Sequence, residues 1–204
     1  SLNLLLQNSS SVGSFDLGIY KSLNDTSPVI EKLKTNQFEI VFLLGQDQIK
    51  FDKKNEFIIY LGSHGDKGAE MADIILPGAA YTEQDGYYTN IEGRLQKAYK
   101  ASYPPGEAKE DWMIINELAE TINHRKLFND KNELESSLLN YLKLFNDNNN
   151  AKKHSKVIDT EFFSEKIKIN EIDYYYSNAI ARSSKTMSEC RSEKINFKLT
   201  GTEA

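Results

Sequence analysis

Residues 38–77 read FEIVFLLGQDQIKFDKKNEFIIYLGSHGDKGAEMADIILP and contain three apolar runs separated by polar turns. Continuous apolar runs of about four to eight residues are typical of strands that are covered on both faces, as in parallel sheets. We therefore predict strands at Phe38–Gly45, Glu56–Gly62 and Asp73–Leu76. Pro77 ends the third strand, because proline has no backbone N–H to donate to a neighbouring strand. The predicted fold class is α/β. The sheet is small, with an unpaired edge and two faces to cover, so we expect another chain or segment to complete it.

A short helix is predicted before the first strand, ending near Asn36. Ser27 suits its N-cap position and Pro28 its first helical position, because the fixed backbone angle of proline matches a helix and its missing N–H needs no partner there. The residues of this helix that we predict to face inward are Val29, Ile30 and Leu33.

Two longer helices are predicted after the third strand. Over Pro105–Asn123 apolar residues recur at spacings of three and four, and acidic residues occupy the first turn, where they suit the helix dipole. The predicted buried face of this helix holds Trp112, Ile115, Leu118, Ala119 and Ile122. The second helix starts near Lys131, with Asp130 and Glu133 in capping-box positions. Its apolar stripe is predicted to hold Leu134, Leu138, Tyr141, Leu142 and Phe145.

The predicted domain organisation has three parts. Residues 1–145 form a partial α/β domain. Residues 146–155, NDNNNAKKHS, are too polar to hold a fixed shape by burying apolar surface, so we place a linker there. Residues 156–204 form a carboxy-terminal extension that contains three consecutive tyrosines, Tyr174–Tyr176, and then a short helix. The residues at helical spacing in this helix are Ile180, Ser184, Met187 and Cys190. We expect the extension to pack back on the domain or on a neighbouring subunit.

Composition indicates a globular protein of 204 residues, 39% hydrophobic and 27% charged. No apolar run approaches the roughly 18 residues needed to cross a bilayer. The formal net charge of −5 argues against a general nucleic-acid binder, which needs a positive field, and the lysine cluster at residues 152–156 does not reverse this. The single cysteine excludes an internal disulfide framework. Iron–sulfur clusters require about four thiolate or imidazole ligands, so Cys190 with three scattered histidines is not expected to hold one.

Three motifs carry a resemblance to a known family. They are GSHGDKGA at 62–69 with ADIILPGAAYTE at 72–83, TNIEGRLQ at 89–96 leading into PPGEAKEDW at 104–112, and DYYYSNAIARSSKTMSEC at 173–190. The first resembles the strand, loop and strand of the molybdopterin oxidoreductases. The second and third are similar to the carboxy-terminal part of the large iron–sulfur subunit (75-kDa type) of respiratory complex I, NADH:ubiquinone oxidoreductase, a degenerate relative of those enzymes.

The resemblance implies an incomplete three-layer α/β domain of the molybdopterin oxidoreductase type. It also implies a non-catalytic structural part of the electron-input arm, on the matrix side of the inner mitochondrial membrane or the cytoplasmic side of a bacterial plasma membrane. The implied partners are the amino-terminal iron–sulfur portion of the same subunit, which would hold the clusters, and neighbouring arm subunits, with no nucleic acid and no direct membrane insertion. No cofactor is expected in this chain. The alternative is a subunit that retains molybdopterin, as formate dehydrogenases do.

The glycine-rich loop Gly62–Gly68 has two interpretations. Its amides could converge on a phosphate with help from Lys67, as in catalytic relatives whose loops at strand ends cradle a pterin dinucleotide. The loop has neither the Walker spacing nor G-x-G-x-x-G, so we favour a structural turn. His64 lacks an arrangement of carboxylate and nucleophile around it, so we do not assign it a catalytic role.

The remaining polar residues also lead to no site assignment. His64, His124 and His154 lack metal-ligand spacing, and we expect Cys190 to be an inert thiol. One group of charged residues has two interpretations: an acid pair with a guanidinium partner, or an ion-pair and turn network around Gly86 and Gly93. We prefer the network. Its members are Glu83, Asp85, Glu92 and Arg94. The acids Glu107, Glu110 and Asp111 are read as first-turn acids of a helix rather than as a docking patch. The sequence thus predicts no catalytic, cofactor-binding or metal-ligating residue.

Overall fold

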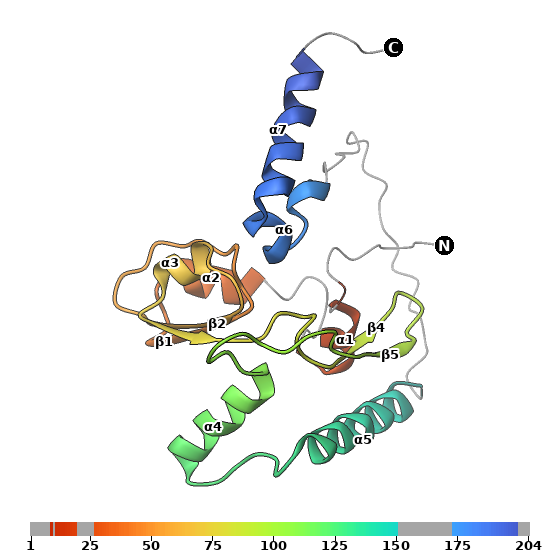
Figure 1. Ribbon diagram of the computed structural model, residues 1–204. Helices are drawn as coiled ribbons and strands as arrows, with labels where there is room; N and C mark the ends of the chain where they lie inside the picture. Colours follow the sequence, from red (N-terminus) through yellow and green to blue (C-terminus); the bar gives the residue numbers. More distant parts are fainter. Residues whose placement is uncertain (1–8, 10, 20–26, 151–172, 200–204) are drawn as a thin grey trace, which may run out of the picture.

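A three-stranded parallel sheet with two short helices on one face forms the first part of the chain (Figure 1). The computed structural model describes residues 9, 11–19, 27–150 and 173–199. Its elements are α1 Ser11–Asp16, α2 Ser27–Lys34, β1 Ile40–Leu44, β2 Phe57–Gly62, α3 Lys67–Met71, β3 Ile74–Pro77, β4 Gly86–Thr89, β5 Leu95–Ala98, α4 Asp111–Asn123, α5 Lys131–Asn150, the 3-10 helix η1 Tyr174–Tyr176, α6 Ala179–Ser183 and α7 Lys185–Leu199. None of the helices in these ranges is long and apolar enough to span a membrane.

The sheet confirms the three predicted strands and their parallel direction. Its order is β1-β2-β3, with Val41 opposite Ile58 and Leu43 opposite Tyr60. These four side chains share one face and are buried, with Ile58 fully so. Leu33 of α2 and Phe51 complete this core cluster. The apolar strand pattern therefore produces the predicted α/β fold class.

The opposite face of the sheet is apolar and exposed. Register places Ile40, Phe42 and Phe57 on this face, and their side chains are 56%, 47% and 43% exposed. Leu44 and Ile74 continue the same surface, at 51% and 44%. We predicted strands covered on both faces. The described residues cover one face at β1 and β2, whereas Ile75 of β3 on that face is exposed. They also cover the carboxyl end of the other face, where Leu61 is buried.

The outer edge of β1 is also open. Phe57 N–H donates to Glu39 O and Gly45 N–H donates to Leu61 O, both at 2.8 Å, so the odd-numbered residues of β1 bond β2. In a parallel ladder the alternate residues, here the even-numbered ones, turn their N–H and C=O groups the other way. No strand pairs with that side of β1 in the part of the chain that the structure describes.

Gly68 allows the loop after β1 to approach α3. Its N–H donates to Asp47 O at 3.1 Å, and a Cβ at this position would lie 2.3 Å from Gln46 O. Gly68→Ala is expected to lower the free energy of unfolding by about 1–3 kcal/mol, because that loop must shift. Gly65→Ala is the matched control, since an added Cβ there meets nothing within 4 Å. The midpoints of urea unfolding for the two variants check this prediction. Equal midpoints would contradict it.

A hairpin that the sequence did not predict follows the sheet. β4 and β5 pair antiparallel, and residues 90–94 form the turn between them. The Asn90 carboxamide oxygen accepts from the Glu92 and Arg94 N–H groups at 3.0 and 2.8 Å, and Gly93 has φ +81°. The T-N-I-E-G-R motif is thus the turn of a hairpin. Helix α1 packs against β4 and α5.

The predicted inward faces of two helices are corrected by the structure. Of the three α2 residues predicted to face inward, Leu33 is buried, whereas Val29 and Ile30 are exposed. α4 begins at Asp111, later than the predicted Pro105, because the preceding residues form a turn and bridge. On α4, Trp112, Leu118 and Ala119 are half-buried, and Ile115 and Ile122 are exposed.

The buried polar residue of α4 is Asn116, which organises the loop to α5. Its carboxamide oxygen accepts from the Leu127 and Phe128 N–H groups at 2.8 and 3.1 Å, and its NH2 group donates to Phe128 O at 2.8 Å. A polar side chain therefore occupies the place where the sequence pattern predicted apolar residues.

Helix α5 starts as predicted. Asp130 accepts from Glu133 N–H at 2.9 Å, and the Glu133 carboxylate accepts from Asn129 N–H at 2.7 Å. Leu142 is buried and Tyr141 is exposed, while the Phe145 side chain lies outside the described residues. α5 continues to Asn150, so it includes the first five positions of the expected linker. Residues 151–155 lie outside the described ranges.

Residues 173–199 form the 3-10 helix η1 and the α-helices α6 and α7, where one short helix was predicted. Ser184 has extended backbone angles and ends α6, and its hydroxyl accepts from Met187 N–H at 3.4 Å at the start of α7. Arg182 on α6 contacts Asp47 and Asp66, which confirms that the segment packs back on the domain. Figure 1 shows α7 extending away from the sheet. Cys190, on α7, is exposed.

Candidate functional site

A pocket of about 350 Å³ lies at the carboxyl ends of β2 and β3. Ligands of open α/β sheets bind in this position, so the pocket is a candidate site. Its lining residues are Gly62, Ser63, His64, Pro77, Gly78, Glu83, Pro105, Glu107 and Ala108. Glu83 and Glu107 contribute carboxylates, and no lysine or arginine is among the described residues that line it. The pocket therefore has an acidic character that disfavours phosphate.

Two amides of the Gly62–Gly68 loop, those of Lys67 and Gly68, have partners within the fold. Lys67 N–H donates to the Asp66 carboxylate at 2.8 Å, and Gly68 N–H donates to Asp47 O. Tyr60 OH donates to His64 O at 2.9 Å, which ties the loop to β2. Because these donors have partners inside the protein, the geometry favours a structural turn over an anion-binding nest.

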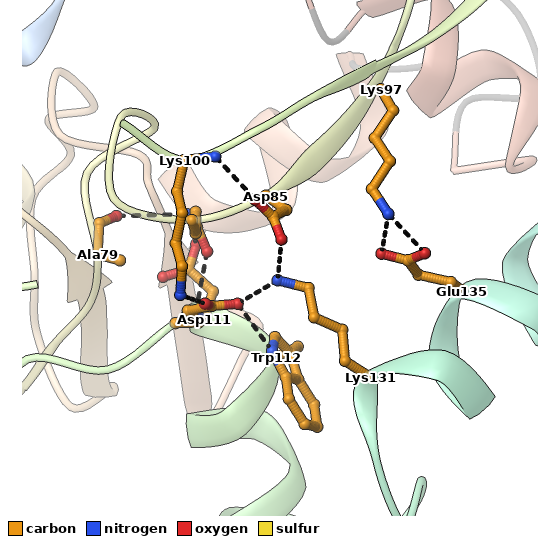
Figure 2. A network of polar contacts seen from close by, with 10 residues as sticks. Ala79, Asp85, Lys97, Lys100, Asp111, Trp112, Lys131 and Glu135 are labelled. Atoms are coloured by element: carbon orange, nitrogen blue, oxygen red, sulfur yellow. Dashed lines mark hydrogen bonds and ion pairs between the residues drawn. The ribbon is translucent and has the colours of Figure 1, made fainter. Parts of the chain in front are cut away.

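A network of two carboxylates and two lysines joins four separate segments (Figure 2). Glu110, just before α4, accepts from Lys131 Nζ at 2.6 Å and from Lys100 Nζ at 3.0 Å. It also accepts from Trp112 Nε1 at 3.1 Å. Asp85, just before β4, accepts from Lys131 Nζ at 3.0 Å and from Lys100 N–H at 2.7 Å. The network therefore fixes the hairpin, α4 and α5 relative to one another.

The titration behaviour of this network follows from its pairing. Burial raises the pKa of Glu110, but the hydrogen bonds from Lys131, Lys100 and Trp112 outweigh it and the pKa lies below its ordinary value. Burial lowers the pKa of Lys131, and its bonds to Glu110 and Asp85 outweigh that, so the pKa is raised. The Lys100 N–H, and then Lys131, lower the pKa of Asp85. These shifts favour the charged forms of Glu110, Lys131 and Asp85.

Beside the network, Gln84 and Asp111 form a reciprocal pair. Gln84 Nε2 donates to Asp111 Oδ2 at 3.0 Å, and Asp111 N–H donates to Gln84 Oε1 at 3.1 Å. Asp111 Oδ1 is buried without a hydrogen-bond partner in the described part of the chain. Burial raises the pKa of Asp111, which Gln84 and the Ala79 backbone oppose only in part. A Cβ at Gly78 would lie 2.6 Å from this oxygen, so the carboxylate packs tightly under the strand-end pocket.

A second lysine–carboxylate contact links the hairpin to α5. Lys97 Nζ lies 2.7 Å from both carboxylate oxygens of Glu135 (Figure 2). The same ammonium group lies 5.5 and 5.4 Å from the ring centres of Tyr87 and Tyr99. The bond to Glu135 raises the pKa of Lys97. This contact and the first network hold α5 against the hairpin from two positions.

The structure separates the four residues that we predicted as one ion-pair network. Asp85 pairs with Lys131, and Glu83 accepts from Ala80 N–H at 2.9 Å within the loop after β3. Glu92 and Arg94 lie exposed in the hairpin turn. The predicted turn is correct, whereas the predicted ion-pair partners are wrong because the partner of Asp85 comes from a helix 46 residues away.

Glu110 also differs from its predicted role. It precedes α4, and its side chain makes no cap hydrogen bond, since the carboxylate is turned toward the lysines. Sequence reasoning missed Lys100, Lys131 and Gln84. Lys131 gave one signal, because a cation at the first position of a helix is disfavoured by the dipole and indicates a partner elsewhere.

The histidines lie on separate elements. His64 is in the loop after β2, and His124 ends α4 with φ 55°. His154 lies outside the described residues. Within the described ranges, no group of three or more histidine, cysteine, aspartate or glutamate side chains could hold a metal ion.

Comparisons with known proteins match nearly the whole length of the chain. Residues 1–121 match the molybdopterin oxidoreductase family, and residues 133–190 match the family of the carboxy-terminal region of the NADH-ubiquinone oxidoreductase G subunit. The chain is 38% identical over 200 residues to the NADH-ubiquinone oxidoreductase 75 kDa subunit of Reclinomonas americana, covering 93% of this chain and 28% of that protein.

Two further relatives give the same picture. The NADH-quinone oxidoreductase G subunit of Rickettsia bellii is 41% identical over 209 residues, with 98% of this chain and 28% of that protein covered. The mitochondrial NADH-ubiquinone oxidoreductase 78 kDa subunit of Candida albicans is 36% identical over 205 residues, with 93% and 27% covered. The chain thus spans a little more than a quarter of the length of these relatives.

Proposed function

Because the chain belongs to the molybdopterin oxidoreductase family and corresponds to the carboxy-terminal part of the complex I subunit, we propose that it is a non-catalytic structural part of the peripheral arm of respiratory complex I. In this role it supports the iron–sulfur portion of the same subunit during electron transfer from NADH to ubiquinone. Its partners are that amino-terminal portion and neighbouring arm subunits. Its location is the matrix side of the inner mitochondrial membrane, or the cytoplasmic side of a bacterial plasma membrane.

The exposed apolar face of the sheet is the observation that carries the structural role. Ile40, Phe42, Leu44, Phe57 and Ile74 form one surface on three adjacent strands. Contiguous apolar surface of this kind marks an interaction site. Since the chain spans little more than a quarter of its relatives, a segment of the same subunit outside it is the natural cover for this face.

The strand-end pocket supports the absence of a pterin. A pterin dinucleotide carries phosphates, which are bound by free backbone N–H groups and cations. The pocket presents Glu83 and Glu107 instead, and the Lys67 and Gly68 amides already have partners. Like charges at this position would repel the dinucleotide, so the described residues do not fit it. Iron–sulfur clusters are assigned to the amino-terminal portion, because this chain has one cysteine.

Capture of the chain from its native membranes tests the proposal. Under mild detergent the chain should migrate with a respiratory complex on a native gel, and mass spectrometry of that band should find the subunit that carries the clusters. Migration as a free polypeptide would contradict the proposed assembly. Metal analysis of the same band tests the alternative, a formate dehydrogenase-like subunit: stoichiometric molybdenum or tungsten bound to this chain would refute the non-catalytic role.

A further inference from the structure

The chain's own arginine, Arg182, lines a second crevice, beside the strand-end pocket. Asp47 lies in the loop after β1, and Asp66 lies in the loop after β2, where it caps α3. Arg182 of α6 donates from Nε to Asp66 Oδ2 at 3.0 Å and from Nη2 to Asp47 Oδ2. Its Nη1 donates to Tyr176 O at 3.3 Å. One guanidinium group therefore bridges two strand-end loops and the η1 helix.

Local structure positions each part of this contact. The two carboxylate oxygens of Asp66 have different partners: one accepts from Lys67 N–H and the other accepts from Arg182. On the other side, Asn178 caps α6 by accepting from Ala181 N–H at 2.9 Å. That cap sets the start of α6, so Arg182, one turn later, faces the loops. The Arg182 side chain is only 16% exposed, and that of Asp47 is 17%.

The surroundings explain why an arginine suits this position. The crevice has a volume of about 270 Å³, and residues of η1 and α6 line it together with the two strand-end loops. Without Arg182 it would hold two carboxylates and no cation among the described residues that line it. A planar guanidinium can bond both carboxylates at once, whereas an ammonium group cannot span them with fixed geometry.

We propose that residues 173–183 act as a clamp that closes the crevice at the carboxyl ends of β1 and β2, with Arg182 occupying the place that an external cationic ligand would take. The clamp joins Arg182 to Asp66 and to Asp47, which lie 116 and 135 positions earlier in the chain. It fixes the base of α7, which extends from this point (Figure 1). This inference concerns contacts within the chain and does not depend on its place in a respiratory complex.

Hydrogen exchange of the full 204-residue chain tests the clamp. Arg182→Gln should speed exchange of the amides in Ala179–Ser183 about 10- to 50-fold, as expected when one partner of a half-buried ion pair is removed. Arg182→Lys should give a smaller increase in the exchange rate, because an ammonium group replaces the planar guanidinium but keeps the positive charge. Peptides from Phe57–Gly62 should be unchanged. Arg125→Gln, which makes the same charge change at an exposed loop position, is the matched control and should leave both regions unchanged.

Chemical rescue identifies the ligand class of the crevice. Millimolar ethylguanidinium should restore slow exchange in Arg182→Gln and have no effect on the wild type, in which Arg182 already bonds Asp66 and Asp47. Asp47→Asn should weaken this rescue. Exchange in Arg182→Gln within twofold of the wild type, or no rescue by ethylguanidinium, would overturn the proposal.

A measurement on the wild type covers the case in which Arg182→Gln unfolds the whole domain. Raising the sodium chloride concentration screens a half-buried ion pair but leaves apolar packing in place. Exchange in Ala179–Ser183 should therefore accelerate with salt while Phe57–Gly62 stays protected. Salt-independent exchange of Ala179–Ser183 would also overturn the clamp.

Discussion

Glu110→Gln is expected to lower the free energy of unfolding by about 3 kcal/mol, because it removes the charge that compensates two lysines. Glu110 is 8% exposed and accepts from Lys131, Lys100 and Trp112. A glutamine has one acceptor oxygen, and its NH2 group would face an ammonium group. The expected loss lies at the lower end of the range for buried pairs, since the lysines keep some contact with water.

Urea denaturation of Glu110→Gln, with Glu117→Gln as the matched control, measures this loss. Glu117 pairs with Lys109 at the surface, and both side chains are about half exposed. The control should therefore change the unfolding free energy by less than about 0.5 kcal/mol. The comparison requires that the unfolding free energy fall with urea concentration at the same slope in both variants. Equal losses for the two variants would show that the network contributes no more than a surface ion pair.

The pH dependence of the same comparison has a definite sign. The folded pKa of Glu110 lies below its ordinary value, so its charge contributes stability above the unfolded pKa, near 4.3. That contribution is lost as the pH falls through the folded pKa. The difference between wild type and Glu110→Gln should thus be full above about pH 5 and shrink as the pH falls below about 4. A difference that is constant down to pH 3 would contradict the assigned pairing.

Phe42→Asp is expected to weaken binding of this chain to the rest of its subunit by at least about 100-fold, which corresponds to about 2.7 kcal/mol. Phe42 is the middle residue of β1 and lies on the exposed apolar face, where an unpaired carboxylate would be buried on assembly. The isolated chain should lose only about 1 kcal/mol, because the side chain is half exposed and the change alters mainly strand propensity.

The binding experiment uses the remainder of the subunit as a separate polypeptide, with affinity measured by titration. Ile91→Asp in the hairpin turn is the matched control, since Ile91 is also apolar and 58% exposed but lies away from the sheet. It should leave affinity unchanged within about threefold. If Phe42→Asp bound as tightly as the wild type, the apolar face would not be the docking surface.

The sheet could be predicted from sequence because its signal is local. Each of β1 and β2 is an unbroken apolar run between polar turns, and such runs have few other stable conformations. The hairpin was missed for the corresponding reason. β4 contains the adjacent Tyr87 and Tyr88, so it lacks strict alternation, and four-residue strands carry little propensity signal.

The networks could not be predicted because they depend on tertiary approach. Glu110 meets Lys131 across 21 residues, and Arg182 meets Asp47 across 135. Nothing in the spacing of these residues distinguishes them from solvated surface charges. Faces of helices were misassigned for a related reason: the 3.6-residue pattern on α2 and α4 identifies an apolar side, but the described residues cover only part of it.

The open edge of β1 has a consequence for the chain before it is assembled. Its unpaired N–H and C=O groups run beside exposed isoleucine, phenylalanine and leucine side chains, which is the arrangement that templates intermolecular strand pairing. An orphaned copy would expose this edge to other chains in the cell and become a substrate for chaperones and proteases. The cellular abundance of this polypeptide should therefore follow that of the protein that covers it.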